Sequence, residues 1–560
     1  MPMPEEKKSS LQDQLSQLRR EGEERDAKHR AEVLGYPYVN VTKTPISTEA
    51  LKLIPEDMAR AAKMAAMELR VREIAIAAFD PRLPEAAKAL RDLEAKKYSP
   101  KVFVVSLSGL EQAWRLYAFL QHETLEITGN VKIEKQHLKD LRQKIKTFGD
   151  VKKEIEKFDF SKLVTAPLLE VILAGAVATR ASDVHLEAEE KSAKIRFRLD
   201  GLLHDVFGNI PLKNYGNLVS RIKLLSRLKI NVYGEPQDGR FSITLGEKEV
   251  EMRVSIIPSE FGETIVMRIL DPEAAGAELG DLGLRPDDSA IVERNLSQPN
   301  GLILNTGPTG SGKTTTLYAF LRKLNNPESK VITIEDPIEY RIGGIEQTQI
   351  DAGANYTFAR GLRAIVRQDP DVILVGEIRD LETADIALQA ALTGHLVLST
   401  LHTNDAVGAV PRLVNLGVKP ATIGPALSLV IAQRLVRRLC PECRKPVVPE
   451  KELQAKISRF LKRLPARVER APYEKPTIYK ADGCSRCNGL GYGGRTGIFE
   501  FLEAKDKLEE AVLRDASEVA LKKIAAEQGM VAMQEDGILK VLRGETDLAE
   551  VERVTGAIEW

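Results

Sequence analysis

The feature of this sequence that most constrains its fold is the segment Gly-Pro-Thr-Gly-Ser-Gly-Lys-Thr at residues 307–314. It follows the apolar run 302–304 and precedes residues 314–324, where the pattern is helical. The glycines let the backbone turn tightly so that its N–H groups face inward, and the N-terminus of the next helix adds partial positive charge. A strand, a glycine-rich loop and a helix in this order predict a phosphate-binding loop in an α/β domain.

The predicted ligand of this loop is a nucleoside triphosphate with Mg²⁺, and hydrolysis of that triphosphate is the expected activity. Lys313 is expected to reach the β- and γ-phosphates, and Thr314 to ligate Mg²⁺. The alternative is a glycine-rich turn without a ligand. The residues predicted to bind the nucleotide are Gly307, Pro308, Thr309, Gly310, Ser311, Gly312, Lys313 and Thr314.

Short apolar runs on both sides of the loop are typical of buried parallel strands. Helical stretches separate these runs, so that strands and helices alternate from about residue 284 onward. This alternation predicts a doubly wound α/β core. After about residue 422 we expect mainly helix, interrupted by a cysteine-rich segment. The predicted strands are 301–305, 331–334, 372–375 and 396–400.

Carboxylates gather at the end of the second predicted strand, in Ile-Glu-Asp-Pro-Ile-Glu-Tyr at residues 334–340. The acids are Glu335, Asp336 and Glu339. Their mutual repulsion makes them costly to hold together. A bound metal or an attacking water molecule would explain the cluster, and a solvated acidic turn is the alternative.

A further acid, Glu377, ends the third predicted strand in Ile-Leu-Val-Gly-Glu-Ile-Arg-Asp at residues 373–380. A carboxylate at this strand end can hold Mg²⁺ or its water beside the phosphate loop. The usual residue there is Asp, so Asp369 and Asp371 are nearby alternatives.

His395 and His402 bracket the last predicted core strand, and the chain has only 7 histidines. An imidazole can donate a hydrogen bond to a γ-phosphate and so sense its presence. Packed histidines that make ordinary hydrogen bonds are the alternative.

The four cysteines form two CxxC pairs, Cys440 with Cys443 and Cys484 with Cys487. Two such pairs supply four thiolates for a closed tetrahedral Zn²⁺ site, which would be structural because it leaves no open position. Two redox-active pairs are the alternative.

The rest of the chain divides by composition. It has 560 residues, and 81 Lys+Arg balance 81 Asp+Glu, which argues against a dedicated nucleic-acid coat. No apolar run is long enough to span a membrane, and the first residues lack the apolar region of a signal peptide, so a cytosolic protein is expected.

We also expect an amphipathic helix at residues 61–71. The predicted divisions are a charged tail 1–33, an N-terminal α/β domain 34–120, a linker 121–157, a second domain 158–270, a linker 271–283 and the core 284–560 with a zinc-binding insert 434–500.

Taken together, these motifs resemble the secretion ATPase superfamily, and more narrowly the PilB/GspE family, whose members assemble type IV pili or drive type II secretion. The resemblance covers about residues 160–560. It rests on the phosphate loop, the acidic segments, the histidine segment and the tetracysteine set, in the family's order. Further matches are 181–187 (Ala-Ser-Asp-Val-His-Leu-Glu), 237–241 (Gln-Asp-Gly-Arg-Phe) and 494–500 (Gly-Arg-Thr-Gly-Ile-Phe-Glu).

The resemblance implies a RecA-like core preceded by a small PAS-like domain, with ATP, Mg²⁺ and Zn²⁺ as cofactors. It implies that Glu339 is the catalytic glutamate and that Glu377 serves the Mg²⁺ site. Arg240 and Arg253, from the domain before the core, would act as arginine fingers on the triphosphate, with Arg268 a weaker candidate.

The same resemblance implies that His395 and His402 link the γ-phosphate to domain movement. It also implies a homohexamer that works at the inner face of the cytoplasmic membrane. An inner-membrane platform protein would bind the ring, and a cytoplasmic adaptor would bind the N-terminal domain. Retraction ATPases generally lack the tetracysteine insert and this N-terminal domain, so both features favour assembly or secretion.

A DNA-translocating ATPase or a pilus-retraction ATPase of the same superfamily remains the alternative. A DNA motor would need a basic channel, for which a basic cluster is available, but we predict no nucleic-acid partner. Some relatives bind cyclic di-GMP through Arg-Leu-Gly and Leu-Gly repeats; only residues 33–37 are similar here, so no cyclic di-GMP binding is predicted. The basic cluster consists of Arg434, Arg437, Arg438, Arg444 and Lys445.

Overall fold

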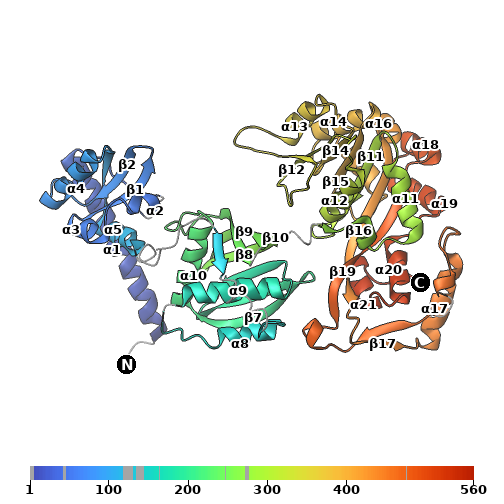
Figure 1. The fold of residues 1–560 in the computed structure, drawn as a ribbon, viewed down its shortest axis with the longest axis horizontal. Helices are drawn as coiled ribbons and strands as arrows, with labels where there is room; N and C mark the ends of the chain where they lie inside the picture. Colours follow the sequence, from blue (N-terminus) through green and yellow to red (C-terminus); the bar gives the residue numbers. More distant parts are fainter. Residues whose placement is uncertain are drawn as a thin grey trace. The chain divides into compact units, whose positions relative to one another are not determined.

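The computed structural model describes residues 5–560 apart from 42–43, 45, 118–129, 134–143, 163, 246–247, 271–275 and 474–475. The chain forms two compact units, Met1–Ile269 and Leu270–Trp560, here called the first and second units (Figure 1). None of the described helices combines the length and the apolar character that crossing a lipid bilayer requires.

The N-terminal part of the first unit is a small three-stranded sheet with helices around it (Figure 1). The first two strands pair antiparallel, and the third lies parallel to the second because a helix crosses over between them. The elements are α1 (Glu5–Leu34), α2 (Thr48–Leu51), α3 (Glu56–Ala61), β1 (Met64–Arg70), β2 (Glu73–Ala78), α4 (Pro84–Ala95), β3 (Ser99–Val104) and α5 (Leu107–Arg115).

The predicted helix at residues 61–71 is wrong, because most of that segment forms β1. Its first four residues, Met64 to Met67, are all buried. A short apolar run of this kind suits a buried strand as well as a helix, and periodicity alone does not separate them. Pairing with β2 decides between the two.

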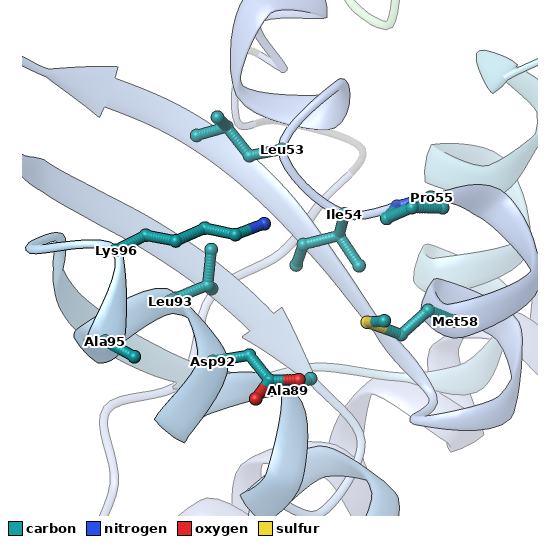
Figure 2. Close-up of a pocket in the computed structure, with 9 residues that line it drawn as sticks. All are labelled: Leu53, Ile54, Pro55, Met58, Ala89, Asp92, Leu93, Ala95 and Lys96. Carbon is teal, nitrogen blue, oxygen red and sulfur yellow. The ribbon is translucent and has the colours of Figure 1, made fainter.

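A surface cavity of about 360 Å³ lies between α3 and the end of α4 in this domain (Figure 2). Its floor is apolar, with Ile54, Ala89 and Leu93 each at most 3% exposed. Asp92 and Lys96 stand at its rim.

The second part of the first unit is a seven-stranded sheet in the order β4-β8-β9-β10-β5-β6-β7. Alternate residues of β6 are buried, as expected of a strand in a sheet that packs one face against a core. Two segments of the predicted linker 121–157 form β4, parallel to β8, and α8. The elements are β4 (Asn130–Ile133), α8 (Phe148–Ile155), α9 (Thr165–Ala178), β5 (Asp183–Ala188), β6 (Ser192–Leu199), β7 (Leu202–Pro211), α10 (Leu212–Leu225), β8 (Gln237–Leu245), β9 (Lys248–Ser259) and β10 (Gly262–Leu270).

The second unit is built on a seven-stranded sheet in the order β13-β12-β14-β15-β11-β16-β19. All neighbours are parallel except the last pair, β16 and β19. Its strands are β11 (Gly301–Thr306), β12 (Val331–Glu335), β13 (Glu346–Gln349), β14 (Val372–Val375), β15 (Leu396–Leu401), β16 (Leu427–Leu439) and β19 (Tyr492–Glu503). A separate antiparallel pair is formed by β17 (Arg444–Val447) and β18 (Ile478–Ala481).

Helices flank this sheet, as expected of a doubly wound core, and every residue of β11 and β15 is buried. The four predicted core strands are confirmed as β11, β12, β14 and β15. The helices are α11 (Pro286–Leu296), α12 (Lys313–Leu324), α13 (Phe358–Val366), α14 (Leu381–Leu392), α15 (Ala409–Asn415), α16 (Pro420–Ala426), α17 (Lys451–Arg463), α18 (Asp506–Arg514), α19 (Glu518–Glu527), α20 (Met533–Leu542) and α21 (Leu548–Thr555).

The expectation of mainly helix after residue 422 is wrong for β16 and β19. These strands form a long antiparallel ribbon, paired from Leu429 with Glu503 to Leu439 with Tyr492. The apolar run in β16 is continuous because the strand lies between β11 and β19 inside the sheet. Such a run has no alternation by which to recognise a strand.

Candidate active site and metal centre

The predicted site residues of the second unit lie at two different ends of its strands. In the parallel ladder Thr306 pairs with Leu401, and Val375 pairs with Ser399. The segments that follow β11, β12, β14 and β15 therefore leave the sheet at one edge, called here the loop edge. Ligands of doubly wound folds bind at the carboxyl ends of the strands.

The phosphate loop connects β11 to α12 at this edge. Gly312 is the residue before the helix and has a φ of +91°, a left-handed conformation that L side chains rarely adopt. Thr314, in the first turn of α12, is exposed. A cavity of about 330 Å³ opens beside the loop, lined by Gly307, Pro308, Thr309, His402, Thr403 and Asn404.

Lys313 bends back over the loop. Its Nζ donates to the carbonyl oxygens of Gly307 at 2.8 Å and Pro308 at 3.1 Å. Burial lowers the pKa of Lys313, the nearby Glu377 raises it, and the nearby Arg434 lowers it further. The ammonium therefore has neutral partners that phosphate oxygens can replace.

Glu377 joins three strand ends at the loop edge. Arg379 donates to one of its carboxylate oxygens, and His402 Nε2, from the end of β15, lies 3.5 Å from the other. Arg379 Nη1 also lies 3.8 Å from Asp336 Oδ2, from the end of β12. The hydrogen bond to Glu377 raises the pKa of Arg379. The structure thus brings the predicted Glu377 and His402 together.

The acidic segment after β12 divides into a buried part and a more open part. Glu335 is 4% exposed, and its carboxylate accepts hydrogen bonds from Thr333 Oγ1 at 2.6 Å, Gln347 Nε2 at 3.2 Å and the Tyr318 hydroxyl. A carboxylate with three donors is satisfied and holds the segment in place. Asp336 is exposed and Glu339 is half-buried.

Arg379 and Tyr318 are site residues without a predicted role. Arg379 lies in the segment 373–380 that contains Glu377, and its place in that motif is the sequence signal that could have identified it. Tyr318 lies on the buried face of α12, where an aromatic residue reads as ordinary core. Burial and the Glu335 carboxylate raise the pKa of Tyr318, so its hydroxyl stays a donor.

His395 is not brought to the loop edge. It precedes β15, where its carbonyl oxygen accepts from Gly301 N at 3.2 Å and its Nδ1 lies 3.0 Å from the Ala390 carbonyl oxygen. The six residues of β15 separate it from His402. At about 3.3 Å per residue, the seven steps from His395 to His402 span about 23 Å along the sheet.

The predicted arginine fingers lie on β8 and β9 of the first unit. Arg240 and Arg253 are directly opposite each other in the ladder, so their side chains share one face of the sheet. Arg240 is 79% exposed, with Glu251 Oε1 4.0 Å away. Like charges placed opposite each other are unfavourable until an anion joins them. Arg268, on β10, instead donates to Asp183 Oδ1 at 3.1 Å.

The four cysteines form a cluster at the far end of the β16–β19 ribbon. Cys440 directly follows β16, and Cys487 Sγ accepts from Gly491 N, just before β19. All four Sγ atoms lie within 4.8 Å of one another. Three of the separations are 3.7 or 3.8 Å.

These separations fit one tetrahedral metal. With Zn–S bonds of about 2.3 Å, the sulfur atoms of a tetrahedron lie about 3.8 Å apart. Burial raises the pKa of the Cys487 thiol, but the N–H groups of Cys484 and Gly491 outweigh it and lower the pKa to about 7. A thiolate is the form that binds metal.

Two family matches cover most of the chain. Residues 160–553 match the family described as type II/IV secretion system protein. Residues 34–123 match the MshEN domain. The chain belongs to the type II/IV secretion system protein family. The resemblance predicted from its motifs is therefore confirmed, and the chain is an ATPase of this family.

Individual family members are similar over long stretches. The type II secretion system ATPase E of Vibrio cholerae is 48% identical over 394 residues, 70% of this chain and 76% of that protein. The type IV pilus assembly ATPase PilB of Myxococcus xanthus is 38% identical over 519 residues, 92% of this chain and 88% of that protein.

A solved structure supports the predicted fold of the ATPase part. The crystal structure of the Legionella pneumophila ATPase DotB matches with a TM-score of 0.51 and 22% identity, over 70% of this chain and 96% of that one. The α/β class predicted from the alternation of strands and helices is confirmed.

Proposed function

We propose that this ATPase is a homohexameric motor that powers type IV pilus assembly or extension of a type II secretion pseudopilus. The observation that carries the proposal is the loop edge, where Lys313, Glu377 and His402 converge from three different strand ends. Similarity to both named ATPases supports it, since the M. xanthus PilB also covers the N-terminal domain.

The chain's residues divide the work at the loop edge. Lys313 exchanges its carbonyl partners for the β- and γ-phosphate oxygens, and Thr314 would join Glu377 in holding Mg²⁺. Bound Mg²⁺ neutralises charge on the phosphates. Glu339 orients or activates the attacking water. His402, through its contact with Glu377, reports the state of the nucleotide to β15.

Arg240 and Arg253 complete the site in this proposal. The paired cations on β8 and β9 supply positive charge where the transition state gains negative charge. Because they belong to the first unit, they reach a triphosphate only through domain closure. Hydrolysis then changes the arrangement of the units, and this change is the mechanical step. Arg253→Ala should lower kcat at least about tenfold with ATP affinity retained, and unchanged turnover would remove Arg253 from the site.

Cys440, Cys443, Cys484 and Cys487 are proposed to hold one structural Zn²⁺. It would fasten the two strands of the β16–β19 ribbon at their far end. Metal analysis of purified protein should find one zinc per chain and none in Cys484→Ser. An equal zinc content in both proteins would contradict this site.

The partners follow from the same proposal. A cytoplasmic adaptor would bind the N-terminal domain and an inner-membrane platform protein the ring, at the cytoplasmic face of the membrane. We retain the prediction that residues 1–160 bind no cyclic di-GMP. Calorimetry on the full chain tests it, and tight binding would contradict it.

A genetic test addresses the motor function directly. Deletion of the gene should abolish either surface piliation or type II secretion in the native cell, and which is lost identifies the machine. Wild-type protein should restore the phenotype and Lys313→Ala should not. Arg363→Ala, which removes an exposed ion pair with Glu382, is the matched control and should restore it. Intact piliation and secretion combined with lost pilus retraction or DNA transport would overturn the proposal.

A further inference from the structure

Gln433 lies on β16 directly beneath the phosphate loop. Its side chain is buried, with 2% of the residue exposed. One oxygen, Oε1, accepts from Asn305 Nδ2 at 3.1 Å and from Thr316 Oγ1 at 2.8 Å. Asn305 belongs to β11 just before the loop, and Thr316 to the first turn of α12 just after it. A single amide oxygen therefore ties together the two ends of the loop.

The loop backbone also rests on Gln433 at two glycines. A Cβ added to Gly307 would lie 2.6 Å from the Gln433 carbonyl oxygen, and one added to Gly312 would lie 2.8 Å from Gln433 Nε2. In both cases Gln433 supplies the nearest atom. These glycines are required by close approach as well as by their positive φ angles of +149° and +91°.

The orientation of Asn305 depends on the same contact. Its Oδ1 is buried without a hydrogen-bond partner among the described residues, so the bond from its Nδ2 to Gln433 is what orients the amide. Ser311 Oγ, inside the loop, is also buried and has no hydrogen-bond partner within the described part of the chain. Inside the loop, Lys313 Nζ and Ser311 N donate to loop carbonyl oxygens, and the contacts from Gln433 on β16 add support from outside the loop.

We propose that Gln433 is a positioning residue that sets the conformation of the phosphate loop and thereby its affinity for triphosphate. It acts through Asn305, Thr316 and the two glycines. The inference rests on the proposed nucleotide-binding role of the loop. It adds a residue 119 positions along the chain from Thr314, on the strand that ends at the cysteine cluster.

Variants of the full chain separate positioning from simple packing. Gln433→Leu leaves the donors of Asn305 and Thr316 buried and unpaired, which should weaken ATP binding about tenfold or more. Gln433→Glu keeps the shape and both accepted hydrogen bonds, but places a carboxylate against Gly312. The buried carboxylate has no cation beside it among the described residues, so it should lower the melting temperature, and the Kd and KM for ATP should rise about tenfold.

The control is Ile431→Val, on the same strand, which loses a buried methylene without touching the loop. It should lower the melting temperature and leave KM unchanged. A double variant of Gln433→Leu with Thr316→Val should lose less affinity than the sum of the two single variants.

Two results would overturn the inference. In one, Gln433→Glu binds ATP as tightly as wild type. In the other, KM follows the melting temperature in all variants, Ile431→Val included. If Gln433→Leu does not fold, Gln433→Glu decides alone. Failure of the proposed function would appear differently. The wild-type protein would bind ATP, but deletion of its gene would leave piliation and secretion unaffected.

Discussion

Arg285 and Lys313 are both cations of the second unit held largely away from solvent, but their partners differ. Arg285 belongs to a buried ion network, defined here as Arg285, Asp287, Asp288, Arg467, Asp536 and Lys540. It pairs with Asp536, with Asp288 at 2.8 Å and with Asp287 at 3.0 Å. Lys313 has carbonyl oxygens as its hydrogen-bond acceptors.

The buried ion network neutralises itself. Lys540 Nζ lies 3.0 Å from Asp536 Oδ2, and Arg467 Nη1 lies 2.9 Å from Asp288 Oδ1. Burial lowers the pKa of Arg285, but the carboxylates of Asp536 and Asp288 outweigh it and raise the pKa. Each cation has an anion, so nothing is left for a ligand.

The loop edge is arranged in the opposite way. The pKa of Lys313 is lowered, because burial outweighs the attraction of Glu377. Charge that the protein has matched with charge stabilises the fold, whereas a cation such as Lys313, whose hydrogen-bond acceptors are neutral, indicates where an anionic substrate binds. This difference predicts which substitutions affect chemistry and which affect stability.

The largest effect is expected for Lys313→Ala. Without the ammonium, charge on the transferred phosphoryl group is unmatched, and kcat/KM should fall at least about 10³-fold. The melting temperature should change little, since only two hydrogen bonds to carbonyl groups are lost. Phosphate release and thermal unfolding of the same preparation test both points. Turnover of Lys313→Ala within tenfold of wild type would contradict the assignment of Lys313 to substrate binding rather than to the stability of the fold.

Asp536→Ala should do the reverse. It leaves Arg285 and Lys540 buried without their shared anion, which costs about 3–5 kcal/mol of unfolding free energy. Denaturant titration measures the loss. Asp482→Ala is the control, since its ion pair with Lys445 is about 70% exposed on both sides, and it should cost at most about 1 kcal/mol. Equal losses in the two variants would show that the network contributes nothing special.

A smaller, pH-dependent effect is expected at Glu550, which pairs with Arg437 and Arg553. Burial raises its pKa, but hydrogen bonds from both arginines outweigh it and lower the pKa from 4.5 to about 2. Its stabilisation is therefore present above about pH 4.5 and lost as the pH falls towards 2. Of about 3 kcal/mol, roughly 2 should be gone by about pH 3.

Glu550→Gln isolates that contribution. Between about pH 5 and pH 3, its unfolding free energy should fall by roughly 2 kcal/mol less than that of wild type. Parallel curves for the two proteins would exclude Glu550 as the titrating group.

The sequence was most informative where one physical requirement acts alone. Buried parallel strands must be apolar throughout, so β14 was predicted to the residue. The phosphate loop was recognisable because its glycines sit between such a strand and a helix. Glu377 and His402 follow strand ends, so their meeting at the loop edge could be predicted from topology.

The remaining features depend on contacts that no local pattern records. The strands β1 and β16 carry apolar runs that are compatible with both the helical and the strand period. Pairing with β2 and with β19, respectively, shows that they are strands. His395 and His402 bracket β15 in the sequence, but the parallel register with β11 is what puts the His402 end, and not the His395 end, beside the phosphate loop. Glu335 and Glu339 belong to one acidic segment, and the three donors around Glu335, all from residues outside that segment, separate their environments.

The most direct test of the account is ATP turnover by Glu339→Gln. The account predicts that kcat falls at least about 10²-fold, because the attacking water loses its base, while the Kd for ATP stays within about threefold of wild type. Glu346→Gln, an exposed glutamate of β13, is the matched control and should turn over normally. Wild-type turnover by Glu339→Gln would contradict the account.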